Sequence, residues 1–189
     1  MYISEAFFTA LPGGEREEKE TAVYRLLEQL SIPYQGLDHD RADTMEICEQ
    51  IEGKLGAEIC KNLFLCNQQK TAFYLLMMPG KKVFKTKFLS KQIGSARLSF
   101  AGPEFMEELL NVTPGSVSVF GLMNDNEKRV KLLIDKPLLA QEYIGCHPCV
   151  NTSVVKIKTA DLLEKLLPAL GVTPTIVDLP DPTEEGLPQ

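Results

Sequence analysis

The 189-residue sequence contains no apolar run near the ~20 residues that a helix needs to cross a bilayer, so we expect no membrane partner. Residues 1–12 lack the basic start and the long apolar stretch of a secretory signal. The cysteines number five, an odd count. Without a secretory signal, an odd count is typical of reduced thiols, and the sequence therefore predicts a cytoplasmic protein.

Common catalytic signatures are also missing. The sequence has no G-x-S-x-G, no H-E-x-x-H, no P-loop and no G-x-G-x-x-G. These motifs carry, respectively, an activated serine, a zinc pair with its general base, a phosphate cradle and a dinucleotide site. The usual hydrolase and nucleotide-binding interpretations therefore lack support. We expect neither a metal ion nor another cofactor.

The composition is that of a globular chain, with 44% hydrophobic and 24% charged residues. The length suits one domain with a full core. Only the end departs from this pattern, because the sequence after Leu179 is rich in proline and acidic residues. We therefore expect one domain over residues 1–179 and a mobile acidic tail over residues 180–189.

Apolar periodicity predicts the elements. Stripes at helical spacing indicate helices at 15–30, at 43–55 with Asp43 as its cap and Glu46 as capping-box partner, and from Thr159 to Gly171. Shorter helices are expected at 87–93 and 103–110. Extended runs are expected at 32–37, 61–66, 71–78, 97–100, 117–122, 130–134 and 153–157. Strands and helices in this mixture predict an α+β fold with a mixed, mostly antiparallel sheet.

Charge is unevenly spread along the chain. The net charge of −6 argues mildly against a nucleic-acid partner. The stretch 81–97 nevertheless has no acidic residue and six basic ones: Lys81, Lys82, Lys85, Lys87, Lys91 and Arg97. Such a patch suits a phosphate backbone, but it equally suits a solvated face.

Two polar motifs invite chemical interpretations that their context disfavours. Cys146-His147-Pro148-Cys149 has the spacing of a thiol oxidoreductase, but the following residues are expected to form a strand rather than the helix that activates the first thiol. It also lacks the second ligand pair of a zinc finger. In Asp38-His39-Asp40, adjacent side chains of an extended chain point to opposite faces, so a structural or surface role is favoured.

Two further segments are candidates for binding an ester. Residues 114–121 are expected to form a loop with a glycine near each end, Gly115 and Gly121, and small residues between them. Because no bulky side chain stands in the way, the backbone N–H groups of this loop could bind a carbonyl or an oxyanion closely. An ordinary turn has the same composition. Lys61, followed by Asn62, is the first residue of an apolar strand. A lysine there can present its charge to an ester carbonyl or a phosphate, or it can simply extend its charged end into solvent.

Taken in order, these pieces resemble the prolyl-tRNA editing family, also called YbaK-like or prolyl-tRNA-synthetase-associated domains. The matching segments are 61–65, 97–101, 114–121 with Asn124-Asp125, and 147–153, and the similarity spans about residues 21–171. Freestanding alanyl-tRNA(Pro) deacylases look most similar. The family's loop usually has a proline where Val119 stands here, which affects loop stiffness and the amino acid rejected.

The resemblance implies a barrel-like sheet flanked by helices and hydrolysis of a mischarged tRNA, above all Ala-tRNA(Pro). It implies catalytic roles for Lys61, His147 and Asn151. It implies substrate contacts from Asn62, Gly115, Ser116, Val117, Ser118, Phe120, Gly121 and Thr152. The residues expected at the tRNA acceptor end are Arg97, Lys81, Lys82, Lys85 and Lys87. The partners are then tRNA and, as a further candidate, prolyl-tRNA synthetase, but not DNA.

Other functions stay open. A module that binds aminoacyl-tRNA or an amino acid without hydrolysis would share the fold. A deacylase for cysteine or serine on another tRNA would share the chemistry. Oxidoreductase chemistry at Cys146 and Cys149 is the third alternative.

Overall fold

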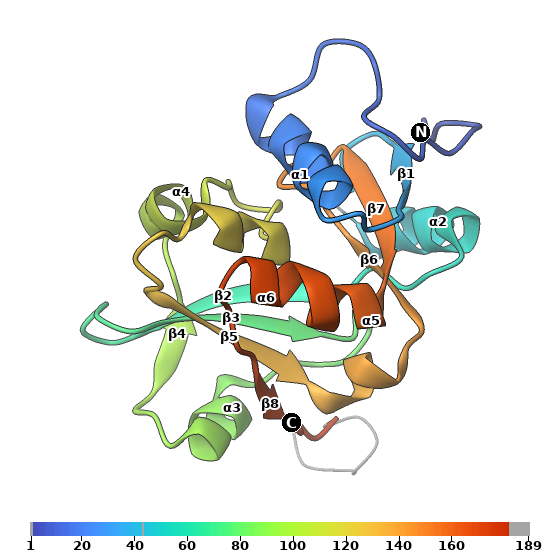
Figure 1. Ribbon diagram of the computed structural model, residues 1–189. Helices are drawn as coiled ribbons and strands as arrows, with labels where there is room; N and C mark the ends of the chain where they lie inside the picture. The colour runs from blue at the N-terminus through green and yellow to red at the C-terminus, as the bar shows by residue number, and fades with distance from the viewer. Residues whose placement is uncertain (1, 43, 182–189) are drawn as a thin grey trace.

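The computed structural model describes residues 2–42 and 44–181, and its strands form two separate sheets (Figure 1). The larger has the order β4-β2-β3-β5-β8 and the smaller β1-β7-β6. Four of the pairings are antiparallel and two, β3 with β5 and β5 with β8, are parallel. The predicted α+β class with a mostly antiparallel, mixed arrangement is confirmed. The sheets are open rather than closed on each other, so the barrel-like description is not confirmed.

The five-stranded sheet is built around a hairpin. β2 (Lys61–Asn67) and β3 (Phe73–Met78) pair so that Lys61 lies opposite Met78. The Asn67 side-chain oxygen accepts the N–H of Thr71 at 2.8 Å and thereby closes the turn. The remaining strands are β4 (Leu98–Phe100), β5 (Val130–Asp135) and β8 (Thr175–Val177).

In the three-stranded sheet, the central strand comes last in the chain. β7 (Ser153–Lys158) lies between β1 (Gln35–Asp38) and β6 (Tyr143–Cys146), antiparallel to both. The two sheets meet where Ile59 bridges Gly145 and the Cys60 N–H donates to the Gly145 carbonyl at 2.9 Å. The largest hydrophobic core draws residues from both sheets, including Phe64 and Val155.

The helices cover the sheets from several sides (Figure 1). α2 (Met45–Leu55) packs on the small sheet, where its Ile51 and Leu55 meet Leu37 and Val154. α3 (Thr86–Ile93) covers the other face of the large sheet through Leu89. The other helical segments are α1 (Glu18–Gln29), α4 (Pro103–Leu110), η2 (Lys136–Ala140) and the consecutive turns α5 (Thr159–Asp161), η3 (Leu162–Leu166) and α6 (Leu167–Ala169).

The predicted strand at 117–122 is wrong. The chain forms a 3₁₀ helix there, η1 (Val119–Asn124), because the Ser118 hydroxyl accepts the N–H of Phe120 and starts the turn. Gly121 lies so close to Leu110 that a Cβ would stand 3.0 Å from its carbonyl oxygen. Packing against α4 therefore decides this conformation, rather than the local run of apolar residues.

Most other helix boundaries agree with the prediction within about three residues, but two need correction. Thr44 is the N-cap of α2 and accepts the Ile47 N–H, whereas the predicted cap Asp43 lies outside the described residues. The final helix contains a π-helical turn in which the Leu167 N–H reaches the Leu162 carbonyl. Pro168 lacks the N–H that an α-helical turn needs, which accounts for the widening. The predicted tail falls mostly on 182–189, also outside the described residues.

Candidate active site

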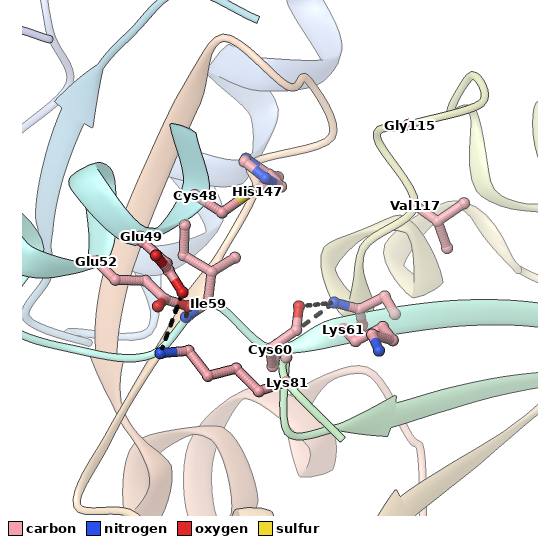
Figure 2. Close-up of a pocket in the computed structure, with 12 residues that line it drawn as sticks. Cys48, Glu49, Glu52, Ile59, Cys60, Lys61, Lys81, Gly115, Val117 and His147 are labelled. Carbon is pink, nitrogen blue, oxygen red and sulfur yellow. Dashed lines mark hydrogen bonds and ion pairs between the residues drawn. The ribbon is translucent and has the colours of Figure 1, made fainter. Parts of the chain in front are cut away.

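A cavity of about 240 Å³ opens where the two sheets meet (Figure 2). It is smaller than the ~300–1,000 Å³ pockets that hold drug-sized ligands, so it suits a small group. Side chains of α2 and His147 lie on one side of it, and Lys61 with the Gly115 loop (residues 114–118) lies on the other. Its lining residues are Cys48, Glu49, Glu52, Ile59, Cys60, Lys61, Asn62, Gly80, Lys81, Gly115, Val117 and His147.

Lys61 is fixed at the rim by the main chain. Its Nζ donates to the carbonyl oxygen of Lys82 at 2.8 Å, and the side chain is half-buried. Burial lowers the pKa of this amine below its ordinary value, while Asp181 and Glu58 oppose the shift. A single carbonyl leaves the ammonium with further donors, and Lys61 is one of the residues that line the cavity.

His147 presents a neutral ring to the same cavity. Its Nδ1 lies 2.7 Å from the carbonyl oxygen of Ser153. Because a carbonyl only accepts, Nδ1 carries the hydrogen and Nε2 keeps its lone pair. Burial, together with the neighbouring His39 ring at 5.6 Å, lowers the pKa of His147 to about 4. The imidazole is therefore an acceptor at neutral pH and not a cation.

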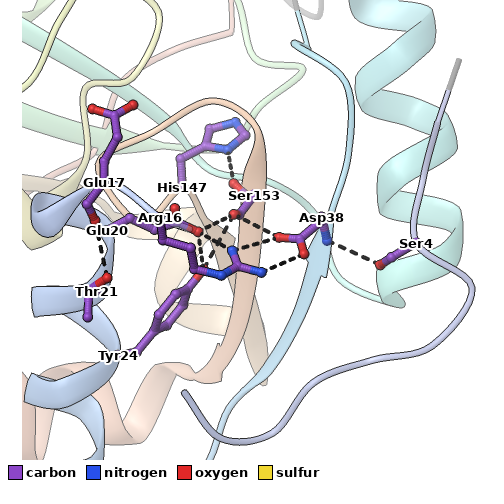
Figure 3. A network of polar contacts seen from close by, with 9 residues as sticks. All are labelled: Ser4, Arg16, Glu17, Glu20, Thr21, Tyr24, Asp38, His147 and Ser153. Carbon is purple, nitrogen blue, oxygen red and sulfur yellow. Dashed lines mark hydrogen bonds and ion pairs between the residues drawn. The ribbon is translucent and has the colours of Figure 1, made fainter. Parts of the chain in front are cut away.

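The strand that orients His147 is anchored in a buried ionic network (Figure 3). The Ser153 hydroxyl donates to Glu20 at 2.7 Å, and the Tyr24 hydroxyl donates to the same carboxylate at 2.8 Å. Arg16 bridges Glu20 at 2.6 Å and binds Asp38 through both terminal nitrogens, at 3.0 and 2.7 Å. This network ties α1, β1 and β7 together behind the imidazole.

The Gly115 loop contributes main chain rather than side chains. Gly115 has φ +87°, and a Cβ there would stand 3.3 Å from the Asn151 Nδ2, so only glycine fits without strain. Among the described residues, the N–H groups of Gly115 and Val117 have no internal acceptor, and both residues line the cavity. Their N–H groups are thus available to a ligand.

The other predicted loop contacts lie behind the cavity wall. Ser116 and Ser118 are buried, and their hydroxyls hold the Thr113 and Phe120 N–H groups. The Ser116 N–H donates to the Thr113 carbonyl, the Gly121 N–H donates to the Ser118 carbonyl, and the Phe120 ring belongs to the core. These residues shape the loop, but they do not line the cavity.

Of the two predicted residues after Pro148, one lies next to the loop and one lies outside. Asn151 is buried beside Gly115, and its carbonyl accepts the Ala42 N–H at 3.4 Å. Thr152 is exposed, and its carbonyl accepts the His39 N–H at 2.9 Å. Neither residue lines the cavity, so Asn151 supports the Gly115 loop from behind.

The basic residues at 81–97 occupy different places. Lys81 lines the cavity, with Nζ 3.8 Å from Glu49, whereas Lys82 is buried in an ion pair with Asp135 at 2.7 Å. Lys85 is half-buried at the start of α3 and Lys87 is exposed. Arg97 precedes Leu98, which pairs with Asn67. By the rise of a strand it lies roughly 20 Å from Lys61.

The sequence interpretation did not single out the residues that α2 contributes. Cys48 and Glu52 are four residues apart on one helical face, and Glu49 neighbours them. Glu52 also accepts the Ile59 N–H at 2.9 Å and so fixes the segment that leads into β2. Their helical spacing was visible in the sequence, but which element that face meets depends on the tertiary fold.

The cysteine motif does not have the properties of an oxidoreductase. A strand follows it, as predicted, and Cys146 Sγ lies 3.3 Å from the thiol of Cys60. The contact with Cys60 and burial raise the pKa of Cys146, and burial raises that of Cys149 to about 12. Thiolates are the reactive species, so these two buried thiols are poor nucleophiles.

The described residues contain no group of three or more His, Cys, Asp or Glu side chains that would suit a metal ion. Asp38-His39-Asp40 illustrates the point. Asp38 binds Arg16, Asp40 accepts the Tyr2 N–H, and the His39 Nδ1 lies 2.7 Å from the Asp40 carbonyl oxygen.

Within the same described residues, no helix is long and apolar enough to cross a membrane.

The chain is similar in sequence to a known protein family and to individual curated proteins. The family described as "Aminoacyl-tRNA editing domain" matches residues 39–165. The prolyl-tRNA editing protein ProX of Acetoanaerobium sticklandii is 33% identical over 86% of this chain and 98% of its own length. The prolyl-tRNA synthetase associated domain-containing protein 1 of Danio rerio is 29% identical over 93% of this chain and 94% of its own.

Solved structures show the same fold. A proposed trans-editing enzyme for prolyl-tRNA synthetase superposes with a TM-score of 0.65 over 87% of this chain and 98% of its own, at 18% identity. The hypothetical protein APE2540 superposes with a TM-score of 0.63 over 86% of this chain and 99% of its own, at 17% identity.

Proposed function

Because this chain belongs to the aminoacyl-tRNA editing family, we propose that it is a freestanding deacylase that hydrolyses the ester of mischarged tRNA, with Ala-tRNA(Pro) as its substrate. One observation carries the proposal. Lys61, Gly115 and His147, with its neutral imidazole, all line one small cavity. Relatives named for prolyl-tRNA editing and for prolyl-tRNA synthetase supply the choice of tRNA and the candidate synthetase partner.

Ester hydrolysis needs positioning and charge stabilisation more than a strong nucleophile, because the aminoacyl ester is already activated. Water adds to the carbonyl carbon, the carbonyl oxygen takes the negative charge, and the bond to the ribose oxygen breaks. The ribose oxygen receives the proton, and alanine and tRNA leave. The N–H groups of Gly115 and Val117, with the ammonium of Lys61, are the donors available to the developing oxyanion.

His147 suits an accepting role in this scheme. A ring with a pKa of about 4 is a weak base, so it orients a donor instead of storing a proton. The water or a ribose hydroxyl is such a donor. The substrate also has an α-ammonium group, and the carboxylates of Glu49 and Glu52 give the α2 side of the cavity the opposite charge.

The proposed reaction would correct an error that proline-specific charging of tRNA cannot avoid. A pocket built for proline cannot reject alanine strongly, because a missing methylene is worth only ~1–3 kcal/mol. A second, smaller site corrects that error by excluding the larger amino acid. Val119 stands where the family usually has proline, and it is the first residue of η1. Proline is favoured at the first position of a helix, and valine occupies that position here.

The test is a panel of tRNAs charged with alanine, serine, cysteine or proline, assayed with the wild type, Lys61→Ala, Cys146→Ser and Lys158→Ala. We expect hydrolysis of Ala-tRNA(Pro) and a roughly 10²–10³-fold lower kcat/KM for Lys61→Ala, as for the loss of an oxyanion donor. Lys158 is an exposed lysine of β7 that lies outside the cavity and serves as the matched control.

Different outcomes identify the alternatives. A wild-type protein that binds Ala-tRNA(Pro) but hydrolyses none of the panel is a binding module. Faster hydrolysis of the cysteine or serine ester reassigns the cargo. Full turnover by Lys61→Ala removes the role given to Lys61, whereas full turnover by Cys146→Ser dismisses thiol chemistry.

A further inference from the structure

An exposed aromatic pair lies on the large sheet outside the cavity. The side chain of Phe100 on β4 is 60% exposed, more than that of any other phenylalanine singled out as an exposed hydrophobic residue. The half-buried Phe84 meets it edge to face, with ring centroids 6.2 Å apart and planes at 72°. The contact fixes the orientation of the Phe100 ring while leaving much of it in solvent, where burying it against a partner would be favourable.

Strand register places this pair on the same sheet face as Lys61. Phe100 pairs with Leu65 on β2, and paired residues of neighbouring strands share a face. Lys61 lies four residues before Leu65, so it also belongs to that face, about 13 Å away by the strand rise. The aromatic pair and the amine of the proposed active site therefore lie along one path on one side of β2.

A short segment links the pair to the cavity directly. Gly80 and Lys81 line the cavity, and the Lys82 carbonyl accepts the Lys61 Nζ at 2.8 Å. Two residues later, Phe84 packs against the same core cluster as Leu63. A bound ligand that extends out of the cavity past Lys61 would therefore reach the aromatic pair along residues 80–84.

The chain between Phe84 and Phe100 is cationic. It contains Lys85, Lys87, Lys91 and Arg97 and no acidic residue, and no acid among the described residues forms an ion pair with any of the four. This contrasts with the chain as a whole, whose net charge is −6. Exposed aromatic rings among unpaired cations are the combination that binds single-stranded nucleic acid.

We propose that Phe84 and Phe100 form a stacking platform for the unpaired nucleotides that precede the aminoacylated 3′-terminal adenosine of tRNA, with the neighbouring lysines holding their phosphates. The inference rests on the proposed function, because the ester in the cavity fixes where the RNA chain begins. The unpaired positive charge selects RNA over an apolar protein segment as the occupant.

The experiment compares a substrate that has those nucleotides with one that lacks them together with the rest of the tRNA. Full-length Ala-tRNA(Pro) has them, whereas 3′-O-alanyl-adenosine has the ester alone. Stacking on a protein aromatic ring predicts that Phe100→Ala lowers kcat/KM on the full tRNA roughly 5- to 150-fold. Turnover of alanyl-adenosine should be unchanged, and Phe100→Trp should retain activity on both substrates.

The matched control is Ile176→Ala. Ile176 is 46% exposed on β8, at the opposite edge of the same sheet, so its loss removes a comparable exposed hydrophobic side chain without touching the platform. Equal losses on both substrates, or no loss on either, would overturn the platform. Unchanged melting temperatures for Phe100→Ala and Ile176→Ala establish that both variants fold.

A binding measurement separates this inference from the proposed function. An uncharged single-stranded oligonucleotide ending in CCA requires no hydrolysis, so its affinity reports on the platform even if the wild type deacylates nothing. Phe100→Ala should weaken this binding at low salt by the same 5- to 150-fold. Equal affinity of the two proteins for the oligonucleotide contradicts the platform and leaves the surface to a protein partner.

Discussion

The Nδ1 of His147 lies 2.7 Å from the carbonyl oxygen of Ser153, and this contact decides what the imidazole can do. The carbonyl fixes the tautomer with the hydrogen on Nδ1. Burial and the nearby His39 ring keep the protonated form unfavourable. The side chain therefore faces the cavity as a hydrogen-bond acceptor over the whole physiological pH range.

A first prediction concerns the pH dependence of activity. With the pKa of His147 near 4, log kcat/KM on Ala-tRNA(Pro) should stay flat from pH 5 to 7 after spontaneous hydrolysis is subtracted. A histidine with an ordinary pKa near 6.5 would bend the profile inside this window. A bend at pH 6.5 that disappears in His147→Asn would show that the ring titrates normally.

A second prediction concerns stability below neutral pH. The folded pKa of His147, about 4, lies below the unfolded value of about 6.5, so between these pH values the unfolded chain binds a proton that the folded chain does not. The free energy of unfolding should fall as the pH drops from about 6.5 to about 4, by on the order of 1–3 kcal/mol. Burial also lowers the pKa of His39, which adds to the same slope.

Urea unfolding at several pH values measures this slope. The comparison is between the wild type and His147→Gln, which removes the titrating ring but keeps a polar side chain. The variant should lose less stability than the wild type on acidification. Parallel curves for the two proteins would mean that His147 does not provide the pH dependence.

A third prediction tests the ionic network behind the imidazole. Arg16→Met leaves the carboxylates of Glu20 and Asp38 without their cation, and Glu20 is buried. Breaking a buried ion pair from one side should lower the free energy of unfolding by about 3 kcal/mol. The double variant Arg16→Met with Glu20→Gln removes one orphaned charge and should recover part of the loss. No recovery would assign the cost to packing of the arginine stem.

A fourth prediction uses one substitution at two glycines. Gly115→Ala forces a Cβ into a left-handed backbone conformation beside Asn151, at a cost of roughly 1–2 kcal/mol in unfolding free energy. It should also lower kcat/KM, because the N–H groups of the loop shift. Gly53→Ala in α2 meets no neighbouring atom and should stabilise the helix by roughly 1 kcal/mol. Equal effects at both sites would contradict the assignment of strain to Gly115.

Local rules predicted the elements whose conformation is decided locally. Pro103 starts α4 and Gly56 ends α2 in a left-handed conformation, as the sequence indicated. The 117–122 run failed because alternating apolar residues fit a strand, while the Ser118 cap and the packing of Gly121 on Leu110 select a 3₁₀ helix. Such contacts become visible only when α4 is in place.

The same division holds for the cavity. Lys61, Asn62, Gly115, Val117 and His147 were predicted and do line it. The resemblance located their segments, but it could not separate lining from supporting residues. The burial of Lys82 depends on Asp135, which is 53 residues away in sequence, and the place of Glu52 depends on how α2 sits over the small sheet. Neither relationship leaves a local pattern.

The position of β7 between β1 and β6 has a consequence for biosynthesis. Asp38 and its strand partner Ser153 are separated by 115 residues, so β1 is synthesised long before the strand that completes its sheet. Until residues 153–158 emerge, His147 has no carbonyl to orient it and the core that joins the sheets is open. A nascent chain therefore lacks the arrangement on which the proposed activity depends. That arrangement forms only late in translation, through contacts distant in sequence that form slowly.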